Sequence, residues 1–175
     1  EKYDLSLATM EVSYMKGLFD KPEEFTTLAS FYLYKKNPAM SAKVLENAIS
    51  EDEISFDTKN AKLLSDSWLF AKERIKSLDV IDESLTLNPN DEKLVKQYVN
   101  IAFSAFEWNE VINGIRKAEK IGVEDDGKHD LMIGIAFFET KDLKKAENSF
   151  IQASKSEKYA DQGRAWLEYL EALKG

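Results

Sequence analysis

The sequence predicts an all-α fold in which antiparallel helix hairpins stack on one another. The first observation is a repeat, because a small-residue position recurs at spacings of 36, 34 and 35 residues, at Ala29, Ser65, Val99 and Gly134. The second is a fixed order of positions after each of these. A small residue follows after 12 residues (Ser41, Ser77, Val111, Ala146), a large apolar one four later (Leu45, Ile81, Ile115, Phe150), and a small one three later (Ala48, Ser84, Ala118, Ala153). A period of about 34 residues is typical of helical-hairpin repeats. Apolar residues also recur at helical spacing in every segment, and no strand-like alternation is sustained.

The first segment, residues 3–18, is predicted to be a helix without its own partner. One helical face has the spacing of the second helix in the later hairpins, and it is formed by Leu7, Ala8, Val12 and Met15. We therefore interpret the segment as an orphan second helix that packs on the first hairpin through this face. Leu5 and Tyr14 should then be exposed or covered by another copy of the chain.

Four hairpins follow, and local signals mark their ends. Pro22 and Pro38 fit the first turns of two helices, where a missing N–H has little cost. Pro89 cannot continue a helix, Asp91 can cap the next one, and Gly122 is suited to a left-handed stop. The hairpins are expected at about residues 23–50, 57–87, 92–121 and 128–154.

The last helix, residues 159–173, is predicted to be a cap. A stack of repeats must cover its last apolar face, and Trp166, Leu170 and Leu173 form one stripe on this helix. Trp166 should lie mostly buried near Phe150. We expect residues 1–175 to form one solenoid domain, and because the chain starts at Glu1 without Met, we expect it to be part of a longer protein.

Composition narrows the function classes. The net charge of −8 disfavours nonspecific binding to nucleic acid or to an anionic membrane. There is no cysteine, and no apolar run is long enough to span a membrane, so no direct membrane insertion is expected. A stack of this kind presents a surface, and the expected partner is a protein or peptide.

The repeat positions resemble those of the tetratricopeptide repeat over about residues 23–155. The resemblance is strongest at residues 131–153, where Gly134, Phe137, Ala146, Phe150 and Ala153 fill the consensus positions in order. Tyr32 and Trp68 occupy the aromatic position of earlier repeats. The third repeat departs from the consensus at Val99, Ala102 and Val111, so its packing is expected to be looser. The resemblance implies a right-handed superhelix of helix hairpins, a non-catalytic protein-interaction role and no cofactor.

A narrower resemblance is carried by the runs LASFYLYKKNPAMSAKVLENAI, LLSDSWLFAKE and YADQGRAWLEYLEAL. They are similar to envelope tetratricopeptide proteins of Gram-negative bacteria, in particular components of TonB-type systems. This resemblance implies a periplasmic location and an accessory role in energised outer-membrane transport, although a cytoplasmic location stays open. Two alternatives remain, which are a general adaptor or co-chaperone of another complex and a structural module for self-assembly.

In such a stack, the first helices of the hairpins are expected to line a concave groove. Lysines beside aromatic and apolar side chains suit an extended or helical partner segment with acidic groups. The candidate groove residues are Thr26, Ser30, Tyr34, Lys62, Asp66, Phe70, Lys96, Asn100, Phe103, Ile135 and Phe138. Lys59, Lys93 and Lys128 occupy further positions of the same face.

Other chemistries have weaker support in the sequence. The carboxylates at residues 124–126, with His129 and Asp130, fit no calcium-loop spacing and suit a helix cap better than a metal site. Lys96 and Asn100 resemble one element of a dicarboxylate clamp, but Met132 stands where that clamp needs a polar residue. With one histidine, no cysteine and no glycine-rich phosphate loop, the chain is not expected to be an enzyme.

Overall fold

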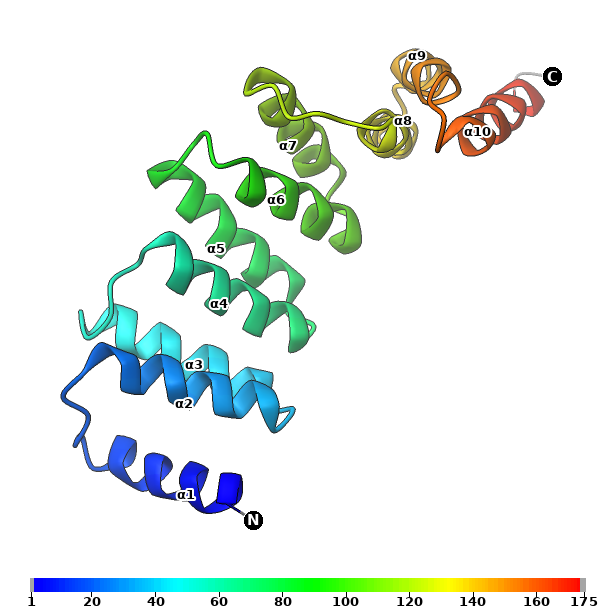
Figure 1. Cartoon of the computed structure of the whole chain (residues 1–175). Helices are drawn as coiled ribbons and strands as arrows, with labels where there is room; N and C mark the ends of the chain where they lie inside the picture. The colour runs from blue at the N-terminus through cyan, green and yellow to red at the C-terminus, as the bar shows by residue number, and fades with distance from the viewer. Residues whose placement is uncertain (1, 174–175) are drawn as a thin grey trace. The chain divides into compact units, whose positions relative to one another are not determined.

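A computed structural model describes residues 2–173 of the chain, and the side chains of residues 6–173. Within this range it contains ten α-helices and no strand (Figure 1). The helices are α1 (Lys2–Met15), α2 (Pro22–Tyr34), α3 (Pro38–Ser50), α4 (Thr58–Phe70), α5 (Arg74–Leu87), α6 (Glu92–Ala105), α7 (Trp108–Lys120), α8 (Lys128–Glu139), α9 (Leu143–Ala153) and α10 (Ala160–Ala172). The predicted all-helical fold is confirmed.

The chain divides into two compact units, residues 1–89 and 90–175. Unit 1 contains α1 and the hairpins α2–α3 and α4–α5, and within it α3 packs on α4. Unit 2 contains the hairpins α6–α7 and α8–α9 followed by α10, and within it α7 packs on α8 and α9 on α10. The helices therefore pack in adjacent pairs, as the repeat predicts. That the whole chain forms one continuous solenoid stays a prediction.

Local sequence signals set the helix ends. Pro22 and Pro38 begin α2 and α3, where the missing N–H needs no intrahelical acceptor. The Asp91 carboxylate accepts hydrogen bonds from two backbone N–H groups of α6, those of Lys93 at 2.9 Å and Leu94 at 3.1 Å. Gly122 has a φ of +75° after the end of α7, as expected for a left-handed helix stop.

The repeat positions form the buried interior of each hairpin. The large apolar residues Leu45, Ile81, Ile115 and Phe150 are at most 1% exposed, and the small residues that surround them are buried too. In the second hairpin, α4 and α5 come close where two buried serines meet, and Ser65 Oγ lies within hydrogen-bond distance of Ser77 Oγ, at 2.9 Å. Each hydroxyl also reaches the backbone carbonyl of the other residue, at 3.1 Å and 2.9 Å. These contacts satisfy hydroxyl groups that burial would otherwise leave without partners.

The third hairpin is not loosely packed, so the expectation drawn from Val99, Ala102 and Val111 was wrong. All three side chains are at most 1% exposed. The reason is a compensating glycine on the second helix, since a Cβ atom at Gly114 would lie 2.8 Å from side-chain carbons of both Val99 and Tyr98. The larger residue on α6 is therefore accommodated by a smaller one on α7.

Helix α1 packs on unit 1 through Leu7, as predicted, but the rest of its contact face differs from the predicted one. Ala8, Val12 and Met15 are exposed, and the side chains that face the unit 1 core are Leu7, Met10 and Tyr14. The ring of Tyr14 lies edge-on to Phe25 at 6.2 Å and near Phe19 at 5.8 Å, and its hydroxyl accepts a hydrogen bond from Asn47. Burying this ring rotates the helix away from the smaller aliphatic stripe, so the expected exposure of Tyr14 was wrong. The Leu5 side chain lies outside the described residues.

Helix α10 covers α9, and Trp166 lies mostly but not fully buried, as predicted. The predicted contact with Phe150 is present, because the two rings stack at 5.1 Å with an angle of 10° between their planes. Leu170, at 2% exposure, is the more deeply buried side chain of α10. Gly163 lets the two backbones come close, as a Cβ there would lie 2.5 Å from the Ser154 nitrogen. This close approach lets both Leu170 and Trp166 of α10 contribute to the packing of unit 2.

Candidate functional site

A hollow of about 450 Å³, lined by six polar or charged residues and one leucine, lies in unit 1 between the first helices of its two hairpins, α2 and α4. Four predicted groove residues line it, namely Thr26, Ser30, Lys62 and Asp66, together with Thr27, Lys59 and Leu63. The 3.6-residue period of each helix brings these positions onto one face. The structure thus brings together, in unit 1, residues that lie more than thirty positions apart in the sequence.

The hydroxyl oxygens that line this hollow can accept hydrogen bonds from a ligand, because their own hydrogens are donated within α2. Ser30 Oγ donates to the Thr26 carbonyl at 2.7 Å, and Thr27 Oγ1 donates to the Glu23 carbonyl at 2.6 Å. Each hydroxyl uses its one hydrogen within α2, so its oxygen lone pairs remain available to a donor from a ligand. The α2 wall of the hollow therefore suits amide and ammonium donors.

The α4 wall carries the charge. Lys59 and Lys62 face the hollow, and Lys62 Nζ lies 3.7 Å from the Asp66 carboxylate one turn further on. The Lys62 and Asp66 side chains are 58% and 33% exposed, so water screens the pair and its contribution to stability is small. Two ammonium groups against one carboxylate leave the wall with a net positive charge.

Tyr34 and Phe70 were also predicted to line the groove, but the hollow of unit 1 does not include them. Each ends its helix, at the turn to the second helix of the hairpin, and each is 67% exposed. They lie on the surface as expected of binding residues, but at an edge of unit 1.

In unit 2, Lys96 and Asn100 of α6 line a second hollow of about 450 Å³ with Lys128 and His129 of α8 and residues 124–126 of the preceding loop. Lys128 Nζ donates to Asn100 Oδ1 at 2.7 Å, and Asn100 Nδ2 donates to the Lys96 carbonyl at 2.8 Å. Both ends of the Asn100 amide are thus engaged within the chain. Three carboxylates outnumber the two lysines here, so this hollow is not a basic one.

The remaining predicted residues are partly buried in aromatic and apolar contacts of unit 2. Phe103 lies edge-on to Trp108 at 5.7 Å, and Phe138 lies 5.2 Å from Trp166. Ile135 is half-buried on α8. None of these three side chains lines the hollow that holds Lys96 and Asn100. They stabilise the packing of unit 2 and expose only part of their surface.

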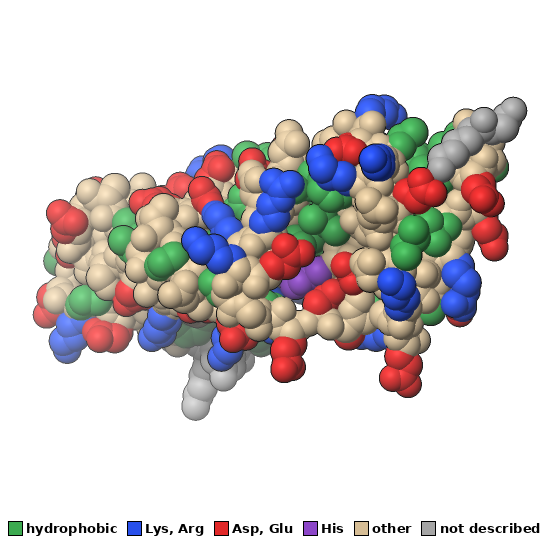
Figure 2. Space-filling view, turned by 90° about the horizontal axis from the view of Figure 1, so that it is seen from above, with side chains coloured by type: hydrophobic (Ala, Val, Ile, Leu, Met, Phe, Trp, Pro, Cys, Tyr) green, Lys and Arg blue, Asp and Glu red, His purple; other side chains and the backbone are tan. Residues whose placement is uncertain are grey.

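The acidic loop before α8 caps that helix. Asp125 Oδ2 accepts hydrogen bonds from the backbone N–H of Gly127 at 3.1 Å and of His129 at 2.8 Å. The histidine, purple in Figure 2, lies among acidic side chains, and its Nδ1 is 3.9 Å from Asp125. This geometry confirms the cap interpretation of the cluster. In residues 2–173, no group of three or more possible ligands is placed to hold a metal ion.

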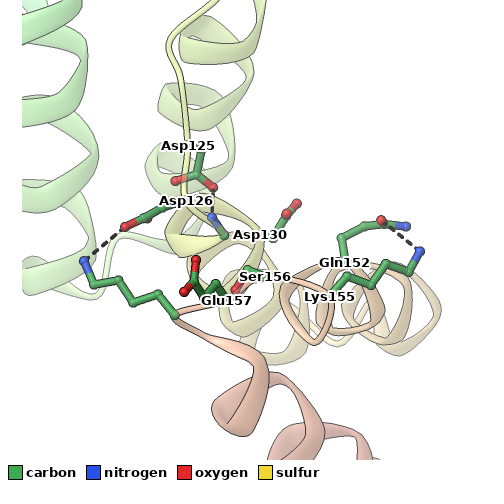
Figure 3. A pocket seen from close by; sticks show the side chains of 9 residues that line it. Asp125, Asp126, Asp130, Gln152, Lys155, Ser156 and Glu157 are labelled. Carbon is green, nitrogen blue, oxygen red and sulfur yellow. Dashed lines mark hydrogen bonds and ion pairs between the residues drawn. The ribbon is translucent and has the colours of Figure 1, made fainter.

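A larger hollow of unit 2, about 830 Å³, lies on the other side of the same loop (Figure 3). Asp126 and Lys158 meet across it at 3.0 Å, and Lys155 contacts Gln152 at 3.2 Å. The ion pair lowers the pKa of Asp126 and raises that of Lys158. Burial, reinforced by Asp125 and Glu119, raises the pKa of Asp130. Among the charged side chains that line this hollow, Asp126 and Lys158 form an ion pair.

Sequence reasoning missed several residues of the hollows. Thr27 and Leu63 each stand two residues before the small-residue position of their helix, Ala29 or Ser65, and next to the predicted groove residues Thr26 and Lys62. That spacing is a signal that could have found them. Residues 124–126 belong to a loop, and helical periodicity says nothing about where a loop passes.

No protein-family model matches the sequence, and no curated protein matches it. Solved structures of MamA are similar in fold. A crystal structure of MamA has a TM-score of 0.63 and 15% identity over 91% of each chain. MamA AMB-1 has a TM-score of 0.67 and 15% identity over 88% of this chain and 82% of that one. MamA from Desulfovibrio magneticus RS-1 has a TM-score of 0.66 and 13% identity over 89% and 86%.

The similarity to these structures concerns the arrangement of the helices, because at these sequence identities binding-site residues are not transferred from one protein to the other. No helix in the described part of the chain combines the length and apolar character needed to cross a membrane. The chain has an all-helical, tetratricopeptide-type fold like that of the MamA structures.

Proposed function

We propose that the chain is a non-catalytic protein-interaction scaffold that holds an acidic segment of a partner protein between α2 and α4. The observation that supports this most is the hollow of unit 1, where Lys59 and Lys62 face the hydroxyl groups of Thr26 and Ser30. Ammonium groups attract carboxylates, and the hydroxyl oxygens accept hydrogen bonds from backbone N–H groups of an extended segment.

We further propose that the partner belongs to a TonB-type transport system and that the chain works in the periplasm as its accessory component. This part of the proposal rests on the sequence resemblance of residues 28–49, 63–73 and 159–173 to envelope proteins of that kind. The hollow gives the physical means of partner binding and does not identify the partner.

Capture of partners from a periplasmic extract tests both parts. The wild-type chain should enrich components of a TonB-type system, measured by quantitative mass spectrometry. Lys62→Glu should weaken capture by up to about fivefold, because one exposed ion pair contributes about 0.2–1 kcal/mol. Asp66→Asn should strengthen capture, because it removes the carboxylate that lies 3.7 Å from Lys62.

The matched control is Lys43→Glu, which makes the same charge change at an exposed position of α3, a second helix. It should leave capture within about twofold of the wild type, and the loss from Lys62→Glu should be larger at low salt, where charges are less screened. Equal capture by both variants would place the site elsewhere. If a partner bound through Lys62 is not a TonB-system protein, the scaffold proposal stands and the TonB assignment is wrong.

A further inference from the structure

The two hairpin turns of unit 1 have the same backbone geometry. Lys36 after α2 and Lys72 after α4 both adopt the left-handed conformation, with φ of 59° and 65°. In each turn the lysine N–H donates to a carbonyl three residues earlier, that of Leu33 or Leu69. Figure 1 shows both turns at the same edge of unit 1, opposite the connections α1–α2 and α3–α4. We name residues 34–38 and 70–76 the turn edge.

Large apolar side chains are exposed on the turn edge. Tyr34 and Phe70 are each 67% exposed and Ile75 is 48% exposed. Lys35 Nζ lies 6.0 Å from the centre of the Tyr34 ring. In the second hairpin, Lys72 follows Phe70 by two residues in the sequence. The hollow between α2 and α4 uses none of these residues.

Charge is separated between the two edges of unit 1. The turn edge carries five basic side chains, Lys35, Lys36, Lys72, Arg74 and Lys76, against one acidic residue, Glu73. The connection between α3 and α4, residues 51–57, carries four acidic residues and no basic one. The overall charge of −8 conceals this separation. At physiological salt, charges further apart than about 8 Å are largely screened, so the nearest charges decide what approaches an edge.

These features favour a membrane surface over a protein partner. Lysines that flank exposed aromatic and aliphatic side chains suit the lipid headgroup region, where rings and ammonium groups both find partners. The side chains project from two separate turns, and none of the three hollows described above includes them. A lipid surface needs no groove, since its headgroups rearrange around each projecting side chain.

We propose that the turn edge of unit 1 docks the protein peripherally on an anionic lipid surface. The basic side chains attract the headgroups, and Tyr34, Phe70 and Ile75 enter the headgroup layer without any helix crossing the membrane. The chemistry recognised is that of phosphate-bearing anionic lipids.

Cosedimentation with lipid vesicles tests the proposal. The wild-type chain should bind vesicles of phosphatidylcholine and phosphatidylglycerol in equal parts, not vesicles of phosphatidylcholine alone, and should be released by salt. The triple variant Lys35→Glu, Lys36→Glu, Lys72→Glu should bind at least about tenfold more weakly, because each basic residue near an anionic surface changes binding about fivefold. The triple variant Tyr34→Ser, Phe70→Ser, Ile75→Ser should also bind more weakly, with the salt dependence unchanged.

A control with the same change in total charge is Lys43→Glu, Lys93→Glu, Lys120→Glu, at exposed positions outside the turn edge. It should keep binding within about threefold of the wild type, since none of its three substituted residues belongs to the turn edge. Equal losses in the two charge variants would show that net charge alone controls binding, and would overturn the proposal. So would a wild type that ignores the anionic vesicles, including one that binds a single-stranded oligonucleotide through the same lysines.

Discussion

Gly134 of α8 lies directly against the ring of Phe150 on α9: a Cβ atom on the glycine would be 2.5 Å from Phe150 Cε1 and 2.6 Å from Cδ1. Phe150 is fully buried, and its other contacts include the stacked ring of Trp166 at 5.1 Å. The small and large positions of the repeat thus meet in space as the sequence predicts. The contact between Gly134 and Phe150 joins the two helices of the fourth hairpin, and the stacking of Phe150 on Trp166 joins this hairpin to the cap helix within unit 2.

Gly134→Ala is expected to destabilise the protein although alanine favours helices. Helix propensity alone would stabilise by about 1 kcal/mol, but overpacking a buried ring costs typically about 1–3 kcal/mol. We expect a net loss of about 1 kcal/mol in the free energy of unfolding, measured by urea denaturation. In a protein that also carries Phe150→Leu, Gly134→Ala should lower the free energy of unfolding by less than it does in the wild type. A stabilised single variant would show that the ring can move aside.

Ser84→Ala is expected to stabilise the protein. Ser84 Oγ is buried and has no hydrogen-bond partner among the described residues, and the same repeat position holds alanine in the other three hairpins, at Ala48, Ala118 and Ala153. Removing an unsatisfied buried hydroxyl should raise the free energy of unfolding by about 1 kcal/mol. The matched control is Ser77→Ala, which removes the 2.9 Å contact with Ser65 and should destabilise. The same sign for both variants would contradict this account.

Trp166→Ala should cost about 2 kcal/mol in urea unfolding, less than the roughly 3–5 kcal/mol typical of a fully buried tryptophan. The ring is mostly but not fully buried, and it stacks on Phe150 and contacts Phe138. Tyr169→Ala, at a position 49% exposed, should cost less than Trp166→Ala. A loss below about 1 kcal/mol for Trp166→Ala would show that the cap contributes little to unit 2.

Asp130→Asn should stabilise the protein at neutral pH and not in acid. Burial raises the pKa of Asp130 in the folded state, so the ionised carboxylate favours unfolding at pH 7. As the pH falls through the folded-state pKa toward the unfolded value of about 3.9, protonation removes this penalty. The urea midpoint of the variant should therefore exceed that of the wild type at pH 7, and the two should converge near pH 3. A difference that does not depend on pH would rule out this origin.

The periodic part of the fold could be predicted from the sequence. A residue such as Leu45 or Phe150 is buried because two helices enclose it, and the same spacing of small and large side chains recurs in every hairpin. Helix starts at Pro22, Pro38 and Asp91 follow from backbone chemistry that acts within a few residues. Both kinds of information are local or repeated, so one sequence contains them.

What could not be predicted depends on contacts made by one residue only. Tyr14 sets the rotation of α1 because its ring contacts Phe25 and its hydroxyl accepts a hydrogen bond from Asn47. Two faces of this helix are apolar enough to pack on unit 1, so the sequence pattern alone does not decide between them. Gly114 on α7 leaves the space that the larger side chain of Val99 on α6 fills. A comparison of each helix with the repeat consensus does not reveal this pairing between two helices. In the site, helical spacing found Thr26, Ser30, Lys62 and Asp66, but not which of the exposed positions line a hollow.

If a partner segment lies on the first helices of the hairpins, site-specific photocrosslinking should detect it there. A photoreactive residue is placed at Ser30 of α2 or, as controls, at Lys43 of α3 and Asn113 of α7, all of which are exposed. We expect that one partner protein crosslinks at Ser30, that Lys62→Glu reduces this product, and that the two control positions give little of it. Equal or stronger crosslinking of that partner at Lys43 or Asn113 would show that the segment does not lie on the first helices.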